Sequence, residues 1–568
     1  MTVTTEKDGF GRRTFITTSS AVAAGVAAAA LPGITGSAGE AAAGVDFVPG
    51  LASGDPTPSR LVIWTRVTPT PTSTAGSGVG PSAVVTWQVA TDKSFTRILK
   101  KGTFTTTAAR DHTVKVDVTG LASATTYYYR FIFKGASSPV ARTRTAPAHT
   151  ATLARMRFGV VSCANLQAGW FSSYRHLAAR DDLDAILHMG DYLFEYGNGE
   201  YGNGMGNVDI RKHVPPHEII SLKDYRQRHG QYKQDKDLAA LHQRYPFINT
   251  WDDHETANDT YAAGPDGGGA ENHTPATEGD FATRRRVSLQ AYDEWMPVRL
   301  SGTAALGDGT QIYRTFQFGD LIDLSMLDLR SYRNAPGKEF STEIGVTGDP
   351  TRVIAGAEQL GWLENNLSTS KARWKLVGNP VMITPVLVPP LPVPVTNAIT
   401  ATAGILPTEG LSYNTDQWDG YSVERKKLTD HIKANDIKNI VFLTGDIHSG
   451  WACDIPSAPG LYPLGGSIAT ELVTTSVTSN NLDDLLGTPS RSASIAVETM
   501  FKVTNRHIKY INLDDHGYSV LDVTPARVQM DYFVISDRAD PAATTTRTAS
   551  WVVRSGTQTT TPSTTGIV

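Results

Sequence analysis

Cysteine is scarce in this sequence. Only two occur among 568 residues, Cys163 and Cys453. At most one disulfide can therefore form, and a disulfide-stabilised scaffold is excluded. The two cysteines can pair with each other, although nothing in their local sequence requires it.

An excess of one charge is also missing. The chain carries 52 basic and 56 acidic residues, well mixed, for a formal net charge of −4. No long basic run occurs, so nucleic acid is not expected as a partner. There is no internal repeat and no G-x-S-x-G motif, which excludes a solenoid and the nucleophile elbow of serine esterases. Hydrophobic residues make up 40% of the chain, enough for a sizeable core.

Long apolar runs are absent outside the N-terminus. There, GRRTFITTSS with Arg12 and Arg13 precedes a short Ala-rich run and a stretch of small residues. This pattern predicts a twin-arginine signal peptide over residues 1–43, and a membrane-anchoring helix is the alternative. The export machinery it addresses carries folded proteins, so the segment predicts secretion and favours a cofactor inserted before export.

Residues 44–147 show the pattern of an all-β domain. Short alternating runs such as LVIWTRV, AVVTWQVA, TVKVDV and TYYYRFIF are separated by turns. Tyr127 and Tyr129 follow a turn, which is typical of a tyrosine corner in an immunoglobulin- or fibronectin-like sandwich.

Residues 153–540 instead alternate strand and helix patterns, as an α/β domain does. Buried strands are predicted in RFGVV, DAILHM, FINT, LIDLSM, WKLVGN and NIVFLT, with helical patterns such as EQLGWLENNL between them. The Pro-rich stretch 385–397 predicts a loop. Residues 541–568 are expected to form a C-terminal tail with a mobile end.

Ligand-type side chains follow several of these strands. The strand ends read SCAN at 162–165, GDY at 190–192, DDHE at 252–255, GN at 378–379 and GDIH at 445–448. In α/β sheets the functional site lies beyond the carboxyl ends of the strands, so we expect these groups to converge. Thiolate, carboxylate, amide and imidazole form a mixed set of metal ligands.

Each group also has a structural alternative. Cys163 alone is a small buried hydrophobe, and DDHE alone is a helix cap with acidic first-turn residues. Asp446 and His448 alone can bond loop backbone. Their repetition at successive strand ends favours a metal site.

The motifs together resemble a known family. VVSCAN, HMGDYLFEYG, TWDDHETANDT, LDLRSYR, VFLTGDIHS and LDDHGYSVLDVTP are similar to the alkaline phosphatase D branch of the calcineurin-like metallophosphoesterases, which also holds secreted iron-containing phospholipases D. The resemblance implies a four-layer α/β metallophosphoesterase β-sandwich flanked by helices, preceded by the all-β domain.

The resemblance also implies residue roles. Asp191 is similar to the carboxylate that bridges two metals, and His254 to the histidine that faces the phosphoryl oxygens and protonates the leaving group. The full set of implied metal ligands is Cys163, Asp191, Asp253, Asn379, Asp446 and His448. Ferric iron and calcium are the implied cofactors.

One position departs from the family pattern. Iron-binding members often place a tyrosine three residues after the bridging aspartate, and here that residue is Phe194. Strand alternation predicts that nearby Tyr192 points to the opposite face. Either the iron lacks one protein ligand or another divalent metal occupies the site.

The implied function is hydrolysis of a phosphoester. Two cations about 3.5–4 Å apart lower the pKa of a bound water and clamp the phosphoryl oxygens. The substrate is a phosphomonoester or diester, or alternatively phosphatidylcholine at the same metal site. Arg330 and Arg333 are candidates for holding phosphate or for surface salt bridges. We expect a monomer.

Two other hypotheses remain open. HIKYINLD supplies His507, Lys509 and Asp514, one copy of the motif of histidine-dependent phospholipases D, but in the second stretch, from His431, Lys438 replaces the aspartate. A non-catalytic secreted protein that binds through the sandwich is the other class, and it leaves the ligand residues unexplained.

Overall fold

The computed structural model describes residues 47, 49–300, 311–337, 348–390, 410–412 and 414–567. The predicted signal peptide and most of the Pro-rich stretch lie outside the described residues. Within the described ranges, no helix combines the length and apolar character needed to cross a membrane.

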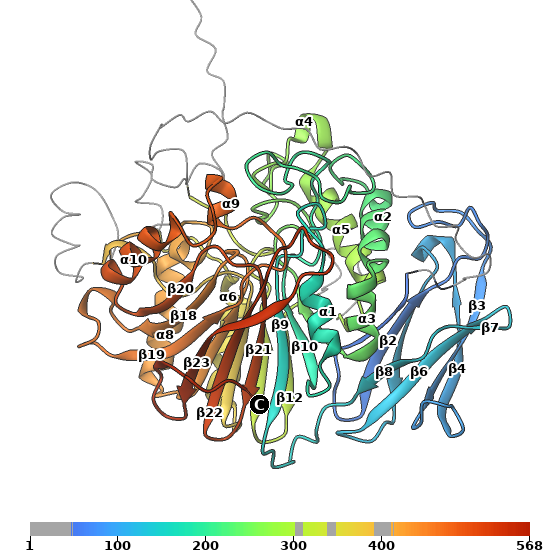
Figure 1. The fold of residues 1–568 in the computed structure, drawn as a ribbon, viewed down its shortest axis with the longest axis horizontal. Coiled ribbons are helices and arrows are strands. Elements are labelled where there is room, and N and C mark those ends of the chain that lie inside the picture. Colours follow the sequence, from blue (N-terminus) through green and yellow to red (C-terminus); the bar gives the residue numbers. More distant parts are fainter. Residues whose placement is uncertain are drawn as a thin grey trace, which may run out of the picture.

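Two large sheets form the centre of the molecule (Figure 1). The ten-stranded sheet contains, in spatial order, β24 (Thr560–Pro562), β23 (Thr545–Arg554), β22 (Arg527–Ile535), β21 (Gly517–Val523), β9 (Met156–Val161), β10 (Ala185–Met189), β11 (Phe247–Thr250), β1 (Leu51–Gly54), β2 (Arg60–Arg66) and β5 (Thr113–Thr119). The seven-stranded sheet contains β12 (Arg314–Phe318), β13 (Ile322–Met326), β14 (Trp374–Asn379), β17 (Ile440–Thr444), β19 (Ser467–Val473), β18 (Gly450–Pro456) and β20 (Ile508–Asn512).

The central strands of both sheets run parallel. β9, β10 and β11 pair in parallel in the first sheet, and β13, β14, β17 and β19 do so in the second. Every residue of β10 (AILHM) and of β17 (IVFLT) is buried. Such unbroken burial is typical of parallel strands that are covered on both faces.

Alternate residues of each strand point to different cores. In β17, Val441 and Leu443 pack between the two sheets, whereas Ile440 and Phe442 pack beneath helices. This period of two follows from the pleat of a strand. The inter-sheet core is therefore built from one face of each sheet.

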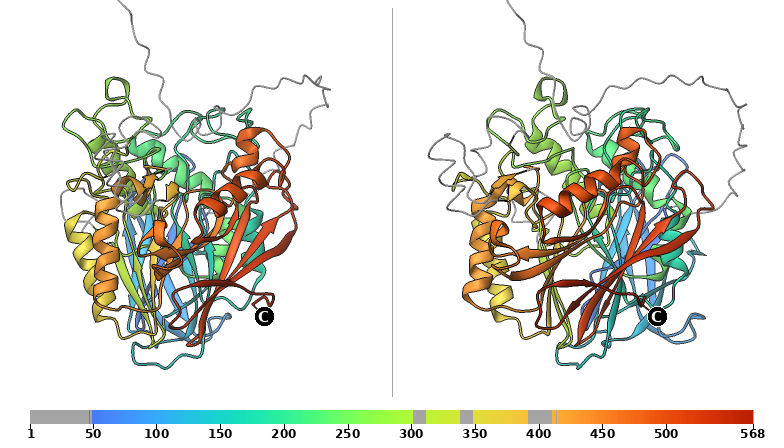
Figure 2. Two further views of the ribbon diagram at one scale, coloured as in Figure 1. Left: turned by 90° about the vertical axis from the view of Figure 1, so that its left-hand side faces the viewer. Right: turned by 60° about the vertical axis from the view of Figure 1, so that its left-hand side comes forward.

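Helices cover the outer faces and complete four layers. α1 (Ser172–Ala179), α2 (Leu222–Lys233), α3 (Lys236–Arg244) and α5 (Phe281–Trp295) pack over the ten-stranded sheet. α6 (Gly356–Thr369) and α8 (Ser422–Ala434) lie side by side over the seven-stranded sheet, as Figure 2 shows. The predicted four-layer metallophosphoesterase fold is confirmed.

The N-terminal region is all-β, as predicted. β4 (Ile98–Thr106), β3 (Ala83–Ala90), β6 (Thr126–Phe133), β7 (Ala136–Ser137) and β8 (Ala141–Arg144) form a separate sheet that shares a core with β1, β2 and β5. The Tyr127 hydroxyl accepts a hydrogen bond from the Ala122 amide at 2.8 Å, which confirms the tyrosine corner. Because β1 pairs with β11, the sandwich is continuous with the large sheet.

Two predictions about irregular segments are wrong. The C-terminal tail expected over residues 541–568 forms β23 and β24, which extend the ten-stranded sheet beyond β22, and β24 lies in the end that was expected to be mobile. Part of the Pro-rich loop forms β15 (Leu387–Pro390), which pairs with β16 (Gly410–Ser412) around a register shift. Proline is tolerated there because this is a two-stranded sheet with edges only.

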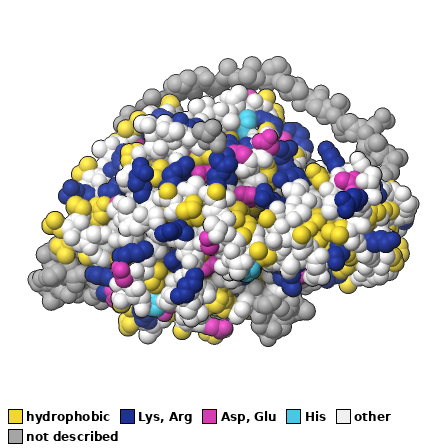
Figure 3. Space-filling view, turned by 90° about the horizontal axis from the view of Figure 1, so that it is seen from below, with side chains coloured by type: hydrophobic (Ala, Val, Ile, Leu, Met, Phe, Trp, Pro, Cys, Tyr) yellow, Lys and Arg dark blue, Asp and Glu magenta, His cyan; other side chains and the backbone are white. Residues whose placement is uncertain are grey.

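Smaller elements complete the upper rim and the connections. They are α4 (Pro275–Glu278), α9 (Leu482–Leu486), α10 (Ser494–Thr504) and the 3₁₀ helices η2 (Ala108–Arg110), η4 (Trp418–Tyr421) and η5 (Pro459–Leu461). Both cysteines are buried and free. On the face seen in Figure 3, basic side chains are spread among hydrophobic and acidic ones.

Candidate metal centre

The predicted ligands converge beyond the carboxyl ends of the parallel strands. Three overlapping groups each have ligand atoms within 4.8 Å of one another: Cys163, Asp191 and His448; Asp191, Asp253 and His254; Asp252, Asp253 and Asp446. Asp191 and Asp253 each belong to two groups. The three groups therefore form one continuous centre. Its residues lie in the loops that follow β9, β10, β11 and β17.

The backbone is bent sharply at this centre. Four of the candidate ligands have left-handed backbone torsions, with φ of 57° at Cys163, 55° at Asp191, 64° at Asp446 and 55° at His448. Such conformations are unfavourable for residues with a Cβ and concentrate at functional sites. The strain turns each side chain from the strand direction toward the shared centre.

Glycine permits the close approach of these turns. A Cβ at Gly190, whose φ is 103°, would lie 2.5 Å from the Cβ of Asp252. A Cβ at Gly445 would collide with the Ser162 hydroxyl, which belongs to the other sheet. The Gly-Asp pairs in GDY and GDIH are therefore required by packing between strand ends.

Buried acidic groups repel one another in this centre. Burial raises the pKa of the Asp191 carboxyl well above its ordinary value, and neighbouring Asp253 raises it further. Burial and then Asp191 likewise raise the pKa of the Cys163 thiol. A bound cation would offset this repulsion and favour the charged forms of both groups.

The donor set fits metal ions. The Oδ2 atom of Asp191 is buried and has no hydrogen-bond partner in the described part of the chain. Nδ1 of His448 lies 2.9 Å from the carbonyl oxygen of Asn480, so Nδ1 donates and Nε2 is left to coordinate. Buried carboxylate, thiol and imidazole groups gathered this closely match the ligand types that metals use.

His254 is held in place by an acidic neighbour. Its Nδ1 lies 2.7 Å from Oε2 of Glu195, and its ring stacks on Phe194 with centroids 4.0 Å apart. The Nδ1 bond leaves Nε2 as the nitrogen that can serve a substrate. Glu195 in turn accepts a hydrogen bond from the Asn258 amide at 2.7 Å.

Arg330 is a buried counter-charge of the centre. Its guanidinium donates to Asp446 at 2.9 Å, to Asp416 at 3.0 Å and to Asp252 through two nitrogens. Arg333 is equally buried and pairs with Asp416 at 2.7 Å. The expectation that these arginines form surface salt bridges is wrong, because neither side chain reaches solvent.

Asn379 is used within the protein. Its Oδ1 accepts a hydrogen bond from the Trp418 indole at 3.0 Å, and its Nδ2 donates to the Thr444 hydroxyl at 3.2 Å. Nδ2 also lies 3.4 Å from Glu471. These bonds fix the end of β14 against β17, so we leave Asn379 out of the ligand set proposed below.

The two aromatic residues after Asp191 point in different directions. The Tyr192 hydroxyl lies 2.8 Å from both Nε2 of His242 and Nζ of Lys233, beneath the helices. The ring of Phe194 instead lies beside His254 and His448, with centroid distances of 4.0 and 6.5 Å. The predicted orientation of Tyr192 is confirmed, and Phe194 occupies a place beside the centre.

Sequence reasoning did not assign three residues that shape the centre. Asp252 joins the third group of ligand atoms, and Glu195 orients His254. Glu255 accepts backbone amides of Asp191, Tyr192 and Asp252 at 2.7–3.2 Å, and burial raises its pKa to about 7. Asp252 and Glu255 were visible in the DDHE motif, and Glu195 in HMGDYLFEYG.

The residues of the histidine-dependent phospholipase motif serve other purposes. Nε2 of buried His507 lies 2.7 Å from the Pro385 carbonyl oxygen. Lys509 donates to the Arg506 carbonyl, and Asp514 accepts the amide of Arg491. These separate structural bonds give no support to a covalent histidine mechanism.

Comparisons with known proteins agree with the geometry. A family model described as PhoD-like phosphatase matches residues 158–532, and one described as PhoD-like phosphatase, N-terminal domain, matches residues 34–147. Alkaline phosphatase D of Bacillus subtilis (strain 168) is 35% identical over 512 residues, which cover 89% of this chain and 80% of that protein.

A solved structure described as the structure of PhoD agrees over nearly the whole chain. It matches with a TM-score of 0.79 and 32% identity, covering 93% of this chain and 94% of its own. The family expected from the motifs is confirmed, and a non-catalytic binding protein is excluded as the main function. The chain belongs to the PhoD-like phosphatase family and is a phosphoester hydrolase.

Proposed function

We propose that this hydrolase uses a dinuclear metal centre bridged by Asp191. The observation that carries the proposal is the sharing of Asp191 between the group with Cys163 and His448 and the group with Asp253. Two cations at such a centre would polarise the phosphoryl oxygens and supply a water acidic enough to attack phosphorus.

The two halves of the centre differ in donor chemistry. Cys163 and His448 offer sulfur and nitrogen beside Asp191, a set suited to iron or another transition metal. Asp253 and Asp446 offer only oxygen, which suits calcium. We propose ferric iron for the first half and calcium for the second, with another divalent metal as the alternative because Phe194 supplies no phenolate.

The protein groups around the centre have separate tasks. His254, with Nδ1 bonded to Glu195, presents Nε2 for protonation of the leaving alkoxide. Phe194 stacks on the imidazole and limits water around it. Arg330 holds Asp252 and Asp446 in fixed positions, which orients the carboxylate oxygens of the second half.

The substrate class that we propose is a phosphomonoester or a phosphodiester, and a phospholipid diester is the second candidate. Asn480 connects the rim to the centre, because its carbonyl faces His448 while its Oδ1 accepts the amide of Gly204. Met205, next in that loop, is 68% exposed, and nearby Val208 is 58% exposed. Apolar side chains at this rim favour contact with an acyl chain.

The proposal is tested by measuring three rates side by side. The substrates are a phosphomonoester, a soluble phosphodiester and phosphatidylcholine in vesicles, with wild-type protein and with Asp191→Asn and His448→Ala. Loss of all turnover in both variants, with an unchanged circular dichroism spectrum, supports the metal assignment. Retained turnover in either folded variant overturns it, and the ratio of the three wild-type rates identifies the substrate class.

We also propose that the protein is secreted by the twin-arginine route. The support is the segment with Arg12 and Arg13, together with a centre enclosed deeply enough to be loaded before export. Replacement of both arginines by lysine should leave active protein inside the cell. Unchanged export of that variant would contradict the proposal.

A further inference from the structure

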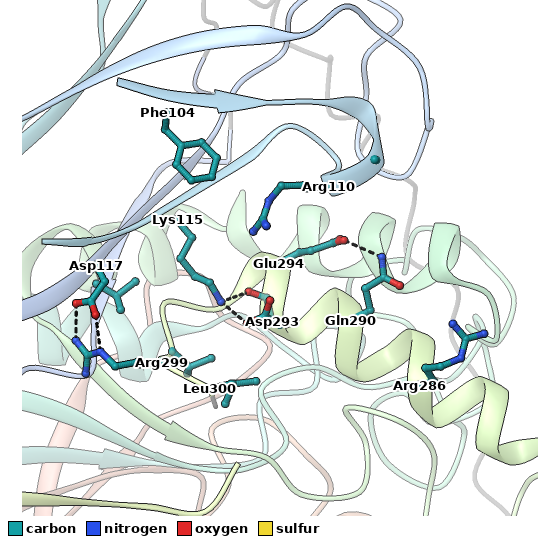
Figure 4. Close-up of a pocket in the computed structure, with 13 residues that line it drawn as sticks. Phe104, Arg110, Lys115, Asp117, Arg286, Gln290, Asp293, Glu294, Arg299 and Leu300 are labelled. Carbon is teal, nitrogen blue, oxygen red and sulfur yellow. Dashed lines mark hydrogen bonds and ion pairs between the residues drawn. The ribbon is translucent and has the colours of Figure 1, made fainter. Parts of the chain in front are cut away.

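A second charged cavity lies between the N-terminal sandwich and α5, away from the metal centre. It has a volume of about 590 Å³ and is lined from one side by η2, β4 and β5 and from the other by α5 and the segment after it (Figure 4). This volume lies in the range of small-ligand sites. Nothing in the proposed mechanism uses it.

The face that α5 turns toward the cavity is polar throughout. Arg286, Gln290 and Glu294 follow one another at intervals of four, which places them in a row along one side of the helix. Asp293 joins this row and pairs with Lys115 of β5 at 2.5 Å. A helix face packed toward another domain would ordinarily be apolar, so the polar row indicates a wet, charged site.

The carboxylates of the cavity are already paired. Asp117 binds Arg299 through two bonds of 2.8 and 2.9 Å and also contacts Arg60 at 3.1 Å. Glu294 binds Arg226 through two bonds of 2.7 Å. Together with the pair of Asp293 and Lys115, these contacts use every acidic group that lines the cavity.

Two of the arginines that line the cavity form no ion pair with another described residue. Among the described residues, neither Arg110 nor Arg286 has a carboxylate partner. Arg110 is half-buried, and its Nε is buried without a hydrogen bond, whereas Arg286 is exposed at the mouth of the cavity. Arg110 reaches down from the sandwich toward the part of α5 that carries Glu294, whereas Gln290 points up from the preceding turn of the helix and Arg286 lies one turn beyond it (Figure 4). Gln290 is bonded to Glu294 at 3.0 Å through one amide hydrogen, so its second hydrogen can be donated.

The positively charged side chains around the cavity also repel one another. Burial lowers the pKa of Lys115, Asp293 raises it, and Arg110 lowers it further. Six cationic side chains therefore surround three carboxylates, counting Arg60 and Arg226 that bind from behind. An anion would relieve this repulsion.

We propose that this cavity binds a phosphoryl oxyanion, held by Arg110, Arg286 and Gln290 between the sandwich and the catalytic domain. Guanidinium groups bind phosphate through paired hydrogen bonds, and both arginines have donors to give. The shared chemistry fits inorganic phosphate, the product of the monoesterase activity proposed above, and it equally fits an organic phosphomonoester whose body contacts Phe104 and Leu300.

Equilibrium dialysis with radiolabelled inorganic phosphate tests the site in the metal-loaded, full-length protein. The test variant is Arg110→Gln with Arg286→Gln. The matched control is Arg97→Gln with Arg373→Gln, because these arginines are exposed, as Arg286 is, but lie outside the cavity. Asp191→Asn is measured in parallel to remove phosphate bound at the metal centre.

We expect the test variant to lose one phosphate equivalent, or to bind it at least tenfold more weakly, while the control and the hydrolytic rate stay unchanged. Gln290→Leu, which keeps both arginines, should weaken the same equivalent severalfold. Wild-type stoichiometry and affinity in the double variant would overturn the proposal. If the proposed metal centre is wrong but the cavity site is right, Asp191→Asn should bind as much phosphate as the wild type, while the double arginine variant still loses its equivalent.

A second arm distinguishes the sources of the ligand. Phenylphosphonate, which is not hydrolysed, replaces inorganic phosphate in the same dialysis. Tighter binding of phenylphosphonate than of phosphate, lost in the test variant, identifies an organic phosphomonoester, and the reverse order identifies the inorganic ion. Binding of neither anion at the arginine-dependent site overturns the proposal.

Discussion

Nδ1 of His254 lies 2.7 Å from Oε2 of Glu195, and both side chains are fully enclosed by protein. The bond fixes the ring orientation and stabilises the charged imidazole, since Glu195 stays ionised: despite burial, contact with His254 keeps the pKa of its carboxyl below the ordinary value. The pair therefore orients the imidazole so that Nε2 is the nitrogen that can act on a substrate.

Replacement of Glu195 by glutamine tests this pairing. We expect kcat for an alkyl phosphate to fall by roughly 10²-fold, within the range for loss of acid catalysis. The loss should be much smaller for p-nitrophenyl phosphate, whose leaving group needs no proton. The double variant with His254→Asn should be no slower than His254→Asn alone, and additive losses would contradict the pairing.

Removal of Arg330 tests its role as a buried counter-charge. Arg330→Leu leaves four acidic side chains without their shared partner: Asp252, Asp253, Asp416 and Asp446. We expect the free energy of unfolding, measured in urea, to fall by roughly 3–5 kcal/mol. Lys426→Ala, which breaks an exposed pair with Asp430, should change it by less than about 1 kcal/mol. Equal effects would contradict the buried role.

Buried His507 makes stability depend on pH. Burial lowers the pKa of its imidazole to about 4, and in the described residues Nδ1 has no hydrogen-bond partner. The folded state disfavours the charged ring. The stability that neutral His507 contributes is therefore fully present above the unfolded pKa of about 6.5, and it is lost as the pH falls through about 4.

The matching experiment uses His507→Gln, which can still donate to the Pro385 carbonyl. Urea unfolding is followed from pH 7 to pH 4 in both proteins. The wild type should lose more stability than the variant across this window, by up to roughly 3 kcal/mol. If the free energy of unfolding depends on pH in the same way in both proteins, the pKa of His507 does not differ between the folded and unfolded states.

The position of Phe194 permits a test of metal identity. Its ring lies beside His254 and His448, so Phe194→Tyr should place a phenol at the edge of the centre. If ferric iron is bound beside Cys163, a phenolate ligand should add a visible absorption band to the purified variant. A metal-loaded variant with no new band would contradict ferric iron in that half. The control is Tyr192→Phe, which removes a phenol that points elsewhere and should leave the spectrum unchanged.

Much of the centre could be predicted from the sequence because each ligand follows a short apolar strand. Cys163, Asp191, Asp446 and His448 stand directly after runs whose burial pattern is local, and parallel strands bring such ends together. Asn379 is the last residue of β14, yet its amide oxygen accepts a hydrogen bond from Trp418, 39 residues away in the chain. A position at the end of a strand does not by itself show whether a side chain binds a metal or forms a hydrogen bond with a distant residue.

Other features depend on long-range packing that no local pattern encodes. Arg330 resembles a surface arginine in sequence, and only the fold places four acidic groups around it. The C-terminal segment is rich in threonine and has few large apolar residues, so it resembles a mobile tail. Threonine also favours strands, and these two strands lie at the outer end of the sheet, where β24 is the edge strand and much of β23 is exposed.

Metal content measured together with activity tests the dinuclear centre most directly. Elemental analysis of the purified protein should find two metal equivalents per chain, with activity lost on chelation and restored when metal is returned. Asp191→Asn, which removes the shared carboxylate, should reduce both equivalents and abolish turnover in a folded protein. Full phosphoester hydrolysis by metal-free protein, or by the Asp191→Asn variant, would contradict a dinuclear centre bridged by Asp191.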